Sequence, residues 1–578
     1  MSKPIKPFMW AYQHYFRAAV KWRAKEVIQT VAPLVEPRAI LVGINTREKP
    51  GGHPVCVDPE DEGWSSARFL GCAEHAEQIY ERVVSEPVEP GYAPRLRDKP
   101  ENIRKSSVRE AVEAVASAYD AEHDTKSFCG YPTTLEGYHV VPILQFQLDQ
   151  LLNYPRLPAA IQFEGWSSPT SLLESIVTCL LEEITRELTS GKEPGRFLDT
   201  LRRDKTAILK EAAERFCVAI ALACQDTSFQ NIFEALNVIS SIPYEGTEAT
   251  GALLFTAASS GAADVRVRLS ETVPIHTHRL ARKMLQMSGQ ELSCICHDAS
   301  GINGLGTLRD GTADGVFCVS FTGHYKWDLY YGDTLVMKSA FGVPYLPSVR
   351  LSEEMFLSTA RRILSSIDVE AGKRLWSIAG AAMEQRRGTI IVISEGAKLE
   401  SLRLRRQSIA LSPTELTPDL IRRLSNIDGA LLVDPRGVCH AVGAILDGLA
   451  TDEGDTSRGA RYNSAIRYVA SAKAATICLI ISEDGYVNMI PVLRPQVYRS
   501  EIVKRVELLK TQTIDNYLKT AAWLDEHRFY LTAGQSRIVN EELARIRSVL
   551  QKLGEVRLTI APFEPHPQMD ENHYLPED

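Results

Sequence analysis

Apolar residues recur with a helical period in several stretches of this chain. From 168 to about 236 they fall at i, i+3, i+4 and i+7, and the same period returns at 353–367 and from 501 to about 553, which predicts amphipathic helices. Ser352 is the expected N-cap of the second stretch. The first 29 residues mix basic and aromatic side chains and also predict an amphipathic helix. That helix either packs on its own domain or lies on an anionic membrane surface.

Shorter apolar runs between these stretches predict strands. Residues 39–43 and 140–146 form two such runs, and between 246 and 347 a series punctuated by Gly and Asp predicts a compact domain of about a hundred residues. Later strands are expected at 389–394, 430–434, 438–446, 475–482 and 486–493. Because these later strands are continuously apolar and alternate with helical segments, they predict a sheet covered on both faces. The expected fold class is therefore multidomain α/β, with a mixed sheet flanked by helices.

Changes in pattern divide the chain into five segments. The expected segments are an N-terminal region of unassigned role (1–157), a helical segment (158–245), a compact strand-rich domain (246–349), the α/β domain (350–500), and a helical extension with a polar tail (501–578). A length of 578 residues agrees with several domains, because a typical domain has roughly 100–200 residues.

Composition excludes several classes of protein. The chain has 65 Lys plus Arg, 73 Asp plus Glu, a formal net charge of −8 and 44% hydrophobic residues, so a collagen-like or largely disordered chain is excluded. The mildly acidic balance gives no reason to expect a nucleic-acid partner. No run of about 18 apolar residues occurs, which argues against a transmembrane helix. A secretory apolar core is absent and the eleven cysteines include no CxxC pair, so we expect thiols in a reducing cytoplasm.

Two clusters of metal-binding residue types are better explained by packing. The run Cys-Ile-Cys-His at 294–297 is too closely spaced for a typical zinc site, and no second pair of ligands follows nearby. His276 and His278 are similarly isolated. We expect both clusters in or beside strands as packing residues. The glycine-rich run 301–306 neither follows a clear strand nor opens a helix, so we expect a loop there rather than a dinucleotide site.

Three short segments of the α/β domain carry candidate chemistry. Asp428 and Gly429 stand directly before a predicted strand, where a carboxylate can bind a metal ion and a glycine lets a ligand approach the backbone. Residues 458–465 combine Gly and Arg at the start of a helix, which favours an anion such as phosphate. Ser482 and Glu483 follow another strand, and Glu483 supplies a second candidate metal ligand.

Together these segments resemble the catalytic domain of the diadenylate cyclases, especially the nucleotide-binding domain of the DNA-integrity-scanning cyclases. The resemblance rests on Asp-Gly-Ala before a strand, Gly-x-Arg-x-x-x-Ala opening a helix and Ile-Ser-Glu after the next strand, and it covers about 350–495. A helix-hairpin-helix DNA-binding region does not follow in this sequence. The resemblance implies that two ATP molecules, each bound to one protomer, condense into cyclic di-AMP with loss of pyrophosphate. It also implies a homo-oligomer whose cyclase domains face each other.

The resemblance assigns roles to individual residues. Asp428 and Glu483 would hold a divalent ion, Mg²⁺ or Mn²⁺, and Asp428 would help to activate the ribose 3′-hydroxyl. Arg461 would hold oxygens of the triphosphate, which makes these three the expected catalytic residues. Gly429 would lie against the adenine, and Ser482 would contact phosphate. Further nucleotide contacts are expected at Ala430, Gly459, Tyr462 and Asn463. Such a site works by positioning and charge neutralisation.

The phosphate-binding motif departs from the family at one place. The usual Gly-Thr-Arg-His-Arg is Gly-Ala-Arg-Tyr-Asn here, at 459–463, so a hydroxyl, an imidazole and a guanidinium are missing. Tyr and Asn can still hydrogen-bond phosphate or a base, and Arg458 or Arg467 could restore a charge. Two interpretations remain: a working cyclase, or a non-catalytic receptor that binds ATP or cyclic di-AMP in a degenerate pocket. Asp428 and Glu483, both retained, favour the enzyme.

The domain before the cyclase-like region resembles a sensor domain called DACNV, which is found joined to diadenylate cyclase domains. The resemblance rests on segments at 250–255, 279–288, 301–306, 316–333 and 337–347. It implies that the upstream domain regulates the cyclase.

Overall fold

A computed structural model of the chain describes residues 8–575 apart from a set of gaps. The gaps are 34, 46–51, 61–63, 86–99, 191–192, 197–200, 202, 228–230, 247, 290–291, 310–314, 348–350, 352, 384–387, 449–459, 482–486, 492, 494–495, 515, 549–559 and 567–568. The expected N-cap Ser352 therefore lies outside the described residues. The chain divides into two compact units, Met1–Val349 and Arg350–Asp578.

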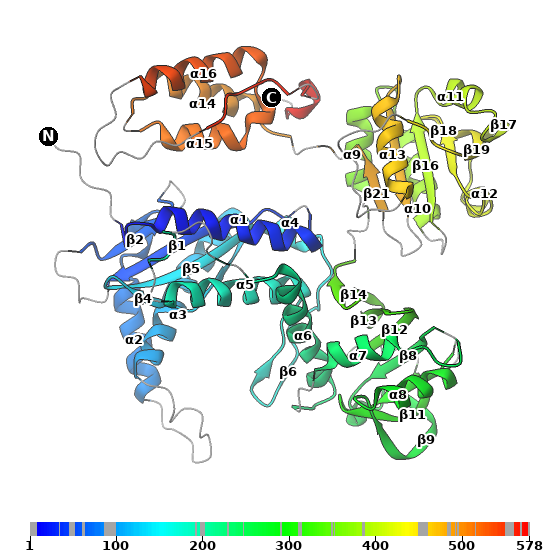
Figure 1. Ribbon diagram of the computed structural model, residues 1–578, viewed down its shortest axis with the longest axis horizontal. Coiled ribbons are helices and arrows are strands. Elements are labelled where there is room, and N and C mark those ends of the chain that lie inside the picture. The colour runs from blue at the N-terminus through cyan, green and yellow to red at the C-terminus, as the bar shows by residue number, and fades with distance from the viewer. Residues whose placement is uncertain are drawn as a thin grey trace. The chain divides into compact units, whose positions relative to one another are not determined.

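The first unit begins with an antiparallel sheet that helices cover on both faces (Figure 1). Its strand order is β2-β1-β5-β3, with β4 also paired to β5. The elements up to the end of the helical segment are α1 (Gln13–Val31), β1 (Arg38–Asn45), β2 (Val55–Asp58), η1 (Ser66–Phe69), α2 (Cys72–Ser85), α3 (Pro100–His123), β3 (Thr125–Cys129), β4 (Thr133–Leu135), β5 (Tyr138–Gln147), α4 (Leu148–Leu152), β6 (Gln162–Phe163), β7 (Trp166–Ser167), α5 (Leu172–Thr189), α6 (Lys205–Ala223) and α7 (Ile232–Ser241). Along β1, Ala39 and Leu41 face the core shared with α1 and α5, whereas Ile40 and Val42 face the core shared with α2 and α3. The alternation of side chains along the strand thus decides which helices lie on which side.

Helix α1 packs on this sheet, which was one of the two interpretations of the N-terminal sequence. Phe16, Val20 and Val27 are buried in the core that also contains β1 and α5. Two aromatic side chains of the same helix, Tyr15 and Trp22, remain exposed. Among the described residues, no helix is long and apolar enough to cross a membrane. The helices expected from 168 to 236 are confirmed as α5, α6 and the start of α7.

A second sheet of the first unit has the order β15-β14-β13-β12-β8-β10-β11-β9, in which β8 and β10 pair in parallel. Its elements are β8 (Thr250–Phe255), η3 (Ala258–Ser260), β9 (Ala263–Pro274), α8 (His278–Met284), η4 (Leu285–Met287), β10 (Ser293–Cys296), β11 (Gly301–Leu308), β12 (Phe317–Gly323), β13 (Lys326–Tyr331), β14 (Thr334–Ala340) and β15 (Val343–Tyr345). Cys294 and Cys296 are buried in β10, so their expected packing role is confirmed. The loop expected at 301–306 is wrong, because these residues belong to β11. A Cβ at Gly304 would lie 2.3 Å from the carbonyl oxygen of Val267 on β9, so the two strands approach too closely for a side chain.

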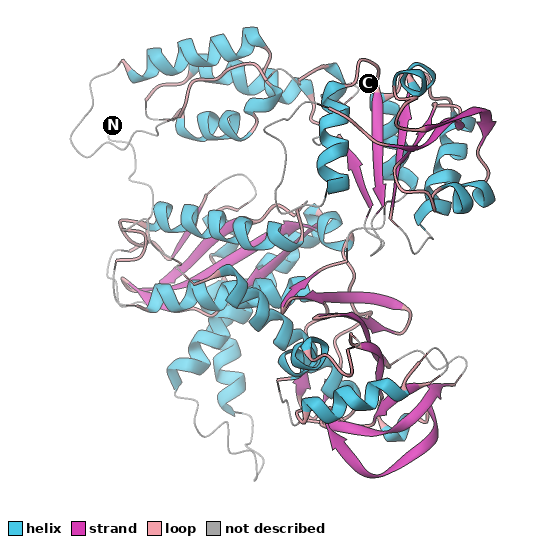
Figure 2. Ribbon diagram, turned by 45° about the vertical axis from the view of Figure 1, so that its right-hand side comes forward, coloured by secondary structure: helices cyan, strands magenta, loops and turns pink. Residues whose placement is uncertain are grey.

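The second unit contains a mixed sheet with the order β17-β19-β18-β16-β20-β21. Its elements are α9 (Glu353–Ile363), α10 (Val369–Met383), β16 (Thr389–Ser394), α11 (Ala397–Arg403), β17 (Ile409–Glu415), α12 (Pro418–Leu424), β18 (Ala430–Val433), β19 (Val438–Ala444), α13 (Ala460–Ser471), β20 (Thr476–Ile481) and β21 (Val487–Ile490). Ile391 and Ile393 of β16 face the core shared with α9, α10 and α12, whereas Ile390 and Val392 face the core shared with α13. Figure 2 shows these strands between helices on both sides. The expected mixed-sheet α/β fold is confirmed.

A small helical domain ends the chain, with α14 (Arg499–Thr511), α15 (Leu518–Glu526), η5 (Arg528–Tyr530), α16 (Ala533–Arg547) and η6 (Glu571–His573). A polar tail was expected from residue 561 onward, and among its described residues Phe563 and Tyr574 are instead packed. Ile560, Phe563 and Tyr574 are buried in the core of these helices, and Tyr574 forms a parallel β-bridge with Val497. The segment is rich in Pro and its apolar residues are irregularly spaced, so no period indicates that it packs.

Candidate active site

Asp428 projects from the turn between α12 and β18. Thr417 caps α12 by accepting a hydrogen bond from the N–H of Leu420, and the helix ends before Ser425. The side chain of Asp428 is 93% exposed. The next residue, Gly429, has a φ of +111°, and a Cβ there would lie 2.5 Å from the carbonyl carbon of Gly443 on β19. Only glycine fits this contact, which fixes the backbone beside the carboxylate.

Arg461 reaches the same place from the first turn of α13. Its Nη2 lies 3.4 Å from Oδ1 of Asp428, and the guanidinium is 41% exposed. Two of the three expected catalytic residues, 33 positions apart in the chain, are thus neighbours in the structure. An exposed ion pair of this kind contributes about 0–1 kcal/mol, so its partners separate readily when a phosphate or a cation competes for them.

The other described residues of the expected site lie around this pair. Tyr462 and Asn463 are half-buried on α13, and the ring of Tyr462 packs against the apolar core on that face of the sheet. Ala430 is fully buried in β18, so it presents no side chain to solvent. Arg467 is exposed further along α13. Gly459, Ser482, Glu483 and Arg458 lie outside the described residues.

Strand register brings the end of β20 to the same edge of the sheet as Asp428. The central strand β16 pairs in parallel with β18, with Ile390 opposite Ala430. On its other side β16 pairs antiparallel with β20, with Thr389 opposite Ile481. The last residue of β20 is therefore two strands from the start of β18, or about 10 Å at the usual strand spacing. A ligand the size of a nucleotide can span that separation.

A second charged cluster of this domain was not expected from the sequence. Arg403 on α11 bonds to both Glu400 and Asp447, and Tyr468 on α13 bonds to Glu400. Asp447 follows Arg403 by 44 positions, and Arg403 belongs to an Arg-rich run that is typical of a solvated helix face. The sequence pattern therefore contained no signal for the pairing of Arg403 with Asp447.

Among the described residues, no group of three or more His, Cys, Asp and Glu side chains is arranged to hold a metal ion.

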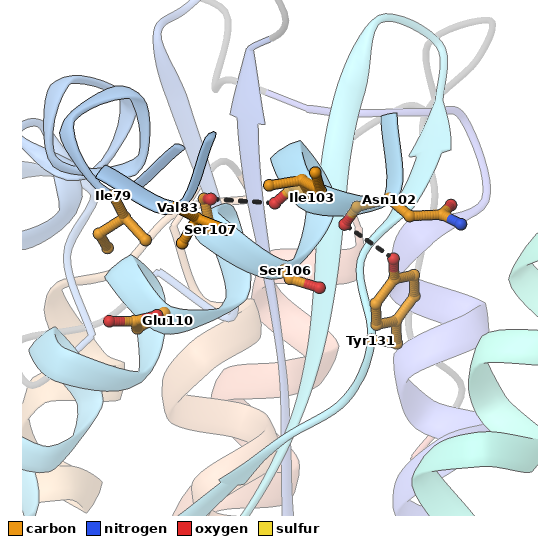
Figure 3. A pocket seen from close by; sticks show the side chains of 8 residues that line it. All are labelled: Ile79, Val83, Asn102, Ile103, Ser106, Ser107, Glu110 and Tyr131. Atoms are coloured by element: carbon orange, nitrogen blue, oxygen red, sulfur yellow. Dashed lines mark hydrogen bonds between the residues drawn. The ribbon is translucent and has the colours of Figure 1, made fainter. Parts of the chain in front are cut away.

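An open cavity of about 310 Å³ lies in the first unit, between α2 and α3 (Figure 3). Tyr131 closes one side, and its hydroxyl donates a hydrogen bond to the carbonyl oxygen of Asn102 at 3.1 Å. Its lining residues are Ile79, Val83, Asn102, Ile103, Ser106, Ser107, Glu110 and Tyr131. None of them belongs to the expected nucleotide site.

Three family models match this chain. Residues 9–217 match "Probable sensor domain DACNG", 230–333 match "Probable sensor domain DACNH", and 378–491 match DAC, described as "DisA bacterial checkpoint controller nucleotide-binding". The expected cyclase-type domain is confirmed, and so is a sensor domain before it. The assignment of that sensor domain to DACNV is corrected to DACNH, since short strands separated by Gly do not distinguish such domains. The N-terminal region, which had no expected role, matches a further sensor domain.

Solved structures with sequence similarity include DacA from Staphylococcus aureus, determined as a cysteine double mutant. It is 20% identical, the match covers 20% of this chain and 80% of that chain, and the TM-score is 0.18. A second is described as a hypothetical membrane spanning protein from Bacillus cereus, with 23% identity, 23% of this chain and 64% of that chain covered, and a TM-score of 0.18. No curated protein matches this chain.

Proposed function

We propose, from the premise that this chain carries a nucleotide-binding domain of the DAC family at residues 378–491, that the protein is a diadenylate cyclase. Two ATP molecules would react head to tail. Each ribose 3′-oxygen forms a bond to the α-phosphorus of the other ATP, while the bond from that phosphorus to pyrophosphate breaks. Two ATP molecules thus give one cyclic di-AMP and two pyrophosphates, and the two hydroxyl protons are released.

The approach of Arg461 to Asp428 is the observation that supports this proposal. The two side chains place a cation and an anion 3.4 Å apart at the exposed edge of the sheet. Arg461 would hold oxygens of the triphosphate through charge-assisted hydrogen bonds. Asp428 would orient the 3′-hydroxyl and accept its hydrogen bond. Phosphoryl transfer depends mainly on such positioning and charge neutralisation, so a site without a covalent nucleophile is sufficient.

The carboxylate of Asp428 also fits a divalent cation such as Mg²⁺ or Mn²⁺. Mg²⁺ is usually held by one or two carboxylates together with water and phosphate oxygens. Asp428 is 93% exposed, so its oxygens are accessible to a cation that a nucleotide brings with it. Glu483 is the proposed second ligand and lies outside the described residues. When bound, the cation would neutralise phosphate charge.

A second copy of this chain is the partner that the reaction requires. One Asp428–Arg461 pair orients one ATP, so a copy related by a twofold axis must orient the other. Large apolar side chains are exposed on α11, on β17 and beside β18 and β19, which suits a surface that a second copy covers. They are Leu399, Leu402, Ile409, Ile427 and Ile445. Product formation is then expected to fall more steeply than linearly on dilution.

Regulation and location complete the proposal. The two matched sensor domains would bind a signal and change the activity of the cyclase domain. The cytoplasm is the proposed location, because the substrate is ATP. The cysteines agree with this, since all eleven lie among the described residues and none forms a disulfide.

The alternative is a non-catalytic receptor for ATP or cyclic di-AMP. One observation favours it: Tyr462, at the position of the family's histidine, packs against the apolar core. The side chain there cannot add positive charge to the phosphate site, so the site is better suited to holding a nucleotide than to stabilising a transition state.

Incubation of the purified full chain with ATP and Mg²⁺ or Mn²⁺ separates the two functions. Chromatography should show cyclic di-AMP and pyrophosphate if the protein is a cyclase. Nucleotide binding by calorimetry without any product would instead support the receptor. Neither binding nor product would contradict both.

A further inference from the structure

One charged network joins three segments of the α/β domain. Arg403 donates two hydrogen bonds to the carboxylate of Asp447, at 2.7 Å each, and further ones to Glu400 at 2.8–3.1 Å. Tyr468 on α13 donates its hydroxyl hydrogen to Glu400 at 2.9 Å. Hydrogen bonding from Arg403 lowers the pKa of Asp447, which keeps this carboxylate charged at neutral pH. The network therefore ties α11 both to α13 and to the residues that follow β19.

The segment 443–448, held by Asp447, begins beside the carboxylate of the candidate site. Gly443, at its start, is the residue whose backbone contacts Gly429, the neighbour of Asp428. Two residues later, the N–H of Ile445 donates a hydrogen bond to the carbonyl oxygen of Gln407 at 3.0 Å. The start of the segment therefore lies against the backbone next to Asp428, so a shift of the segment would also shift Asp428.

The same segment ends against the helix that carries the guanidinium. A Cβ at Gly448 would lie 2.5 Å from the carbonyl carbon of Arg467, so this glycine touches the backbone of α13. Asp447, the partner of Arg403, directly precedes Gly448. Arg461 stands in the first turn of α13. Segment 443–448 therefore bridges the two sides of the site, and Arg403 holds it in place.

From this geometry we infer that Arg403 is a positioning residue of the site, which sets the placement of Arg461 relative to Asp428 through Asp447. The inference rests on the proposed cyclase function. The side chains of Arg403 and Asp447 are each 47% exposed, so this ion pair contributes little to stability. Small displacements of reacting groups, in contrast, reduce turnover strongly. The main effect of losing Arg403 is therefore expected on turnover.

The test compares Arg403→Met and Arg403→Lys with the wild-type full chain. In Arg403→Met we expect kcat to fall about 10-fold to 100-fold, with a smaller change in KM for ATP. Arg403→Lys should recover part of this loss, since lysine keeps the charge but cannot form the bidentate pair. Asp447→Asn should reproduce the loss, and adding it to Arg403→Met should have little further effect. Retention of wild-type kcat in Arg403→Met would overturn the inference.

The matched control is Lys373→Met, which removes an exposed ion pair with Glu370 on α10 of the same domain. Its kcat should stay within about twofold of wild type; an equal loss in both Met variants would also overturn the inference. Hydrogen exchange gives a readout that does not need activity: amides of 443–448 and 460–471 should exchange faster in Arg403→Met. If the wild type forms no cyclic di-AMP, the proposed cyclase function is wrong, but this result does not test the role of Arg403. Unchanged hydrogen exchange in Arg403→Met would show that Arg403 does not hold segment 443–448 in place.

Discussion

Two aspartates of this chain, each beside a sheet edge, show what separates a structural carboxylate from a chemical one. Asp120 of α3 is 8% exposed and accepts hydrogen bonds from the hydroxyl of Thr125, the amide and hydroxyl of Ser127, and the amide of Gln145. The side chain of Asp428 is 93% exposed, and its Oδ1 lies 3.4 Å from Nη2 of Arg461. The carboxylate oxygens of Asp120 accept hydrogen bonds from neutral donors of the same domain, whereas those of Asp428 remain accessible to solvent.

The difference indicates where each charge acts. A buried carboxylate must find its partners within the fold, because an unsatisfied one is costly. Asp120 therefore contributes to stability and has no access to a ligand. Asp428 makes a weak surface contact, contributes little to stability, and is available to a substrate. Substitutions at the two positions should consequently affect different measurements.

The largest expected effect is that of Asp428→Asn on product formation. The amide keeps the shape but loses the charge that orients the 3′-hydroxyl and the cation, so the rate should fall about 10²–10³-fold or more. Thermal unfolding should stay at the wild-type temperature, because the side chain is exposed. Chromatographic product assays and circular dichroism check the two parts. Wild-type turnover in this variant would remove Asp428 from the site.

Asp120→Ala is expected to have the opposite profile. It leaves the hydroxyl of Thr125 and the amide and hydroxyl of Ser127 without the acceptor they have in the wild type, which should lower the free energy of unfolding by about 2–3 kcal/mol. Cyclase turnover at temperatures where the variant is folded should be unchanged in comparison. The control is Glu122→Gln on the same helix as Asp120, which alters an exposed ion pair with Arg68 of η1 and should change stability by less than about 1 kcal/mol. Equal stability of both variants would contradict the structural role.

Arg461→Ala should weaken ATP binding as well as turnover, because the guanidinium would meet phosphate in the ground state too. The loss of a charge-assisted hydrogen bond corresponds to roughly 1.5–3 kcal/mol of binding free energy. Calorimetry measures this loss of ATP affinity directly. The same experiment also tests the receptor alternative, because that function needs Arg461 to bind phosphate as well. Equal affinity in wild type and variant would exclude Arg461 from the site.

The smallest expected effect concerns Glu395, an exposed carboxylate that is nevertheless hydrogen-bonded. Its Oε1 accepts from the hydroxyl of Ser365 at 2.9 Å and from the amide and hydroxyl of Ser366, and these bonds lower its pKa. A carboxyl group with a lowered pKa in the folded state stabilises the fold at any pH above its ordinary, unfolded-state pKa. This stabilisation is lost as the pH falls through the lowered, folded-state pKa. Glu395→Gln should thus reduce stability by less than about 1 kcal/mol at pH 7, with the difference vanishing in strong acid. A difference that grows towards low pH would contradict this.

Much of the α/β domain was predictable, because its central strands β16, β18 and β20 are buried along their length and read as continuous apolar runs. The largely exposed strand β17 was not expected, because it lacks such a run. The strand expected at 389–394 coincides with β16. Asp428 and Arg461 come together in the structure, and their roles in a nucleotide site stay predictions from the resemblance. In contrast, β11 was missed because its glycines hide the alternation of a strand. The burial of Phe563 and Tyr574 was missed because the apolar residues of that segment follow no period.

The polar networks could not be predicted in the same way. Asp120 precedes the end of a helix that carries many charges, and nothing in its neighbourhood indicates burial. Its surroundings arise only when β3 and β5 pair and bring Ser127 beside Gln145. The Arg403–Asp447 pair likewise depends on the return of the chain after β19. Such contacts are set by tertiary structure, whereas periodicity reports only local structure.

The contact between Gly429 and Gly443 has a consequence for natural variation. A methyl group at 429 would collide with the backbone of 443, and one at 443 would come within 2.9 Å of Ile427 Cγ2, while both positions have positive φ. In a saturation-mutagenesis library scored for cyclic di-AMP production, replacements at 429 should be the more damaging, because they meet backbone atoms, whereas those at 443 meet a side chain that can shift. Shared sensitivity at two positions 14 residues apart would then indicate, from mutational data alone, that β18 pairs with β19.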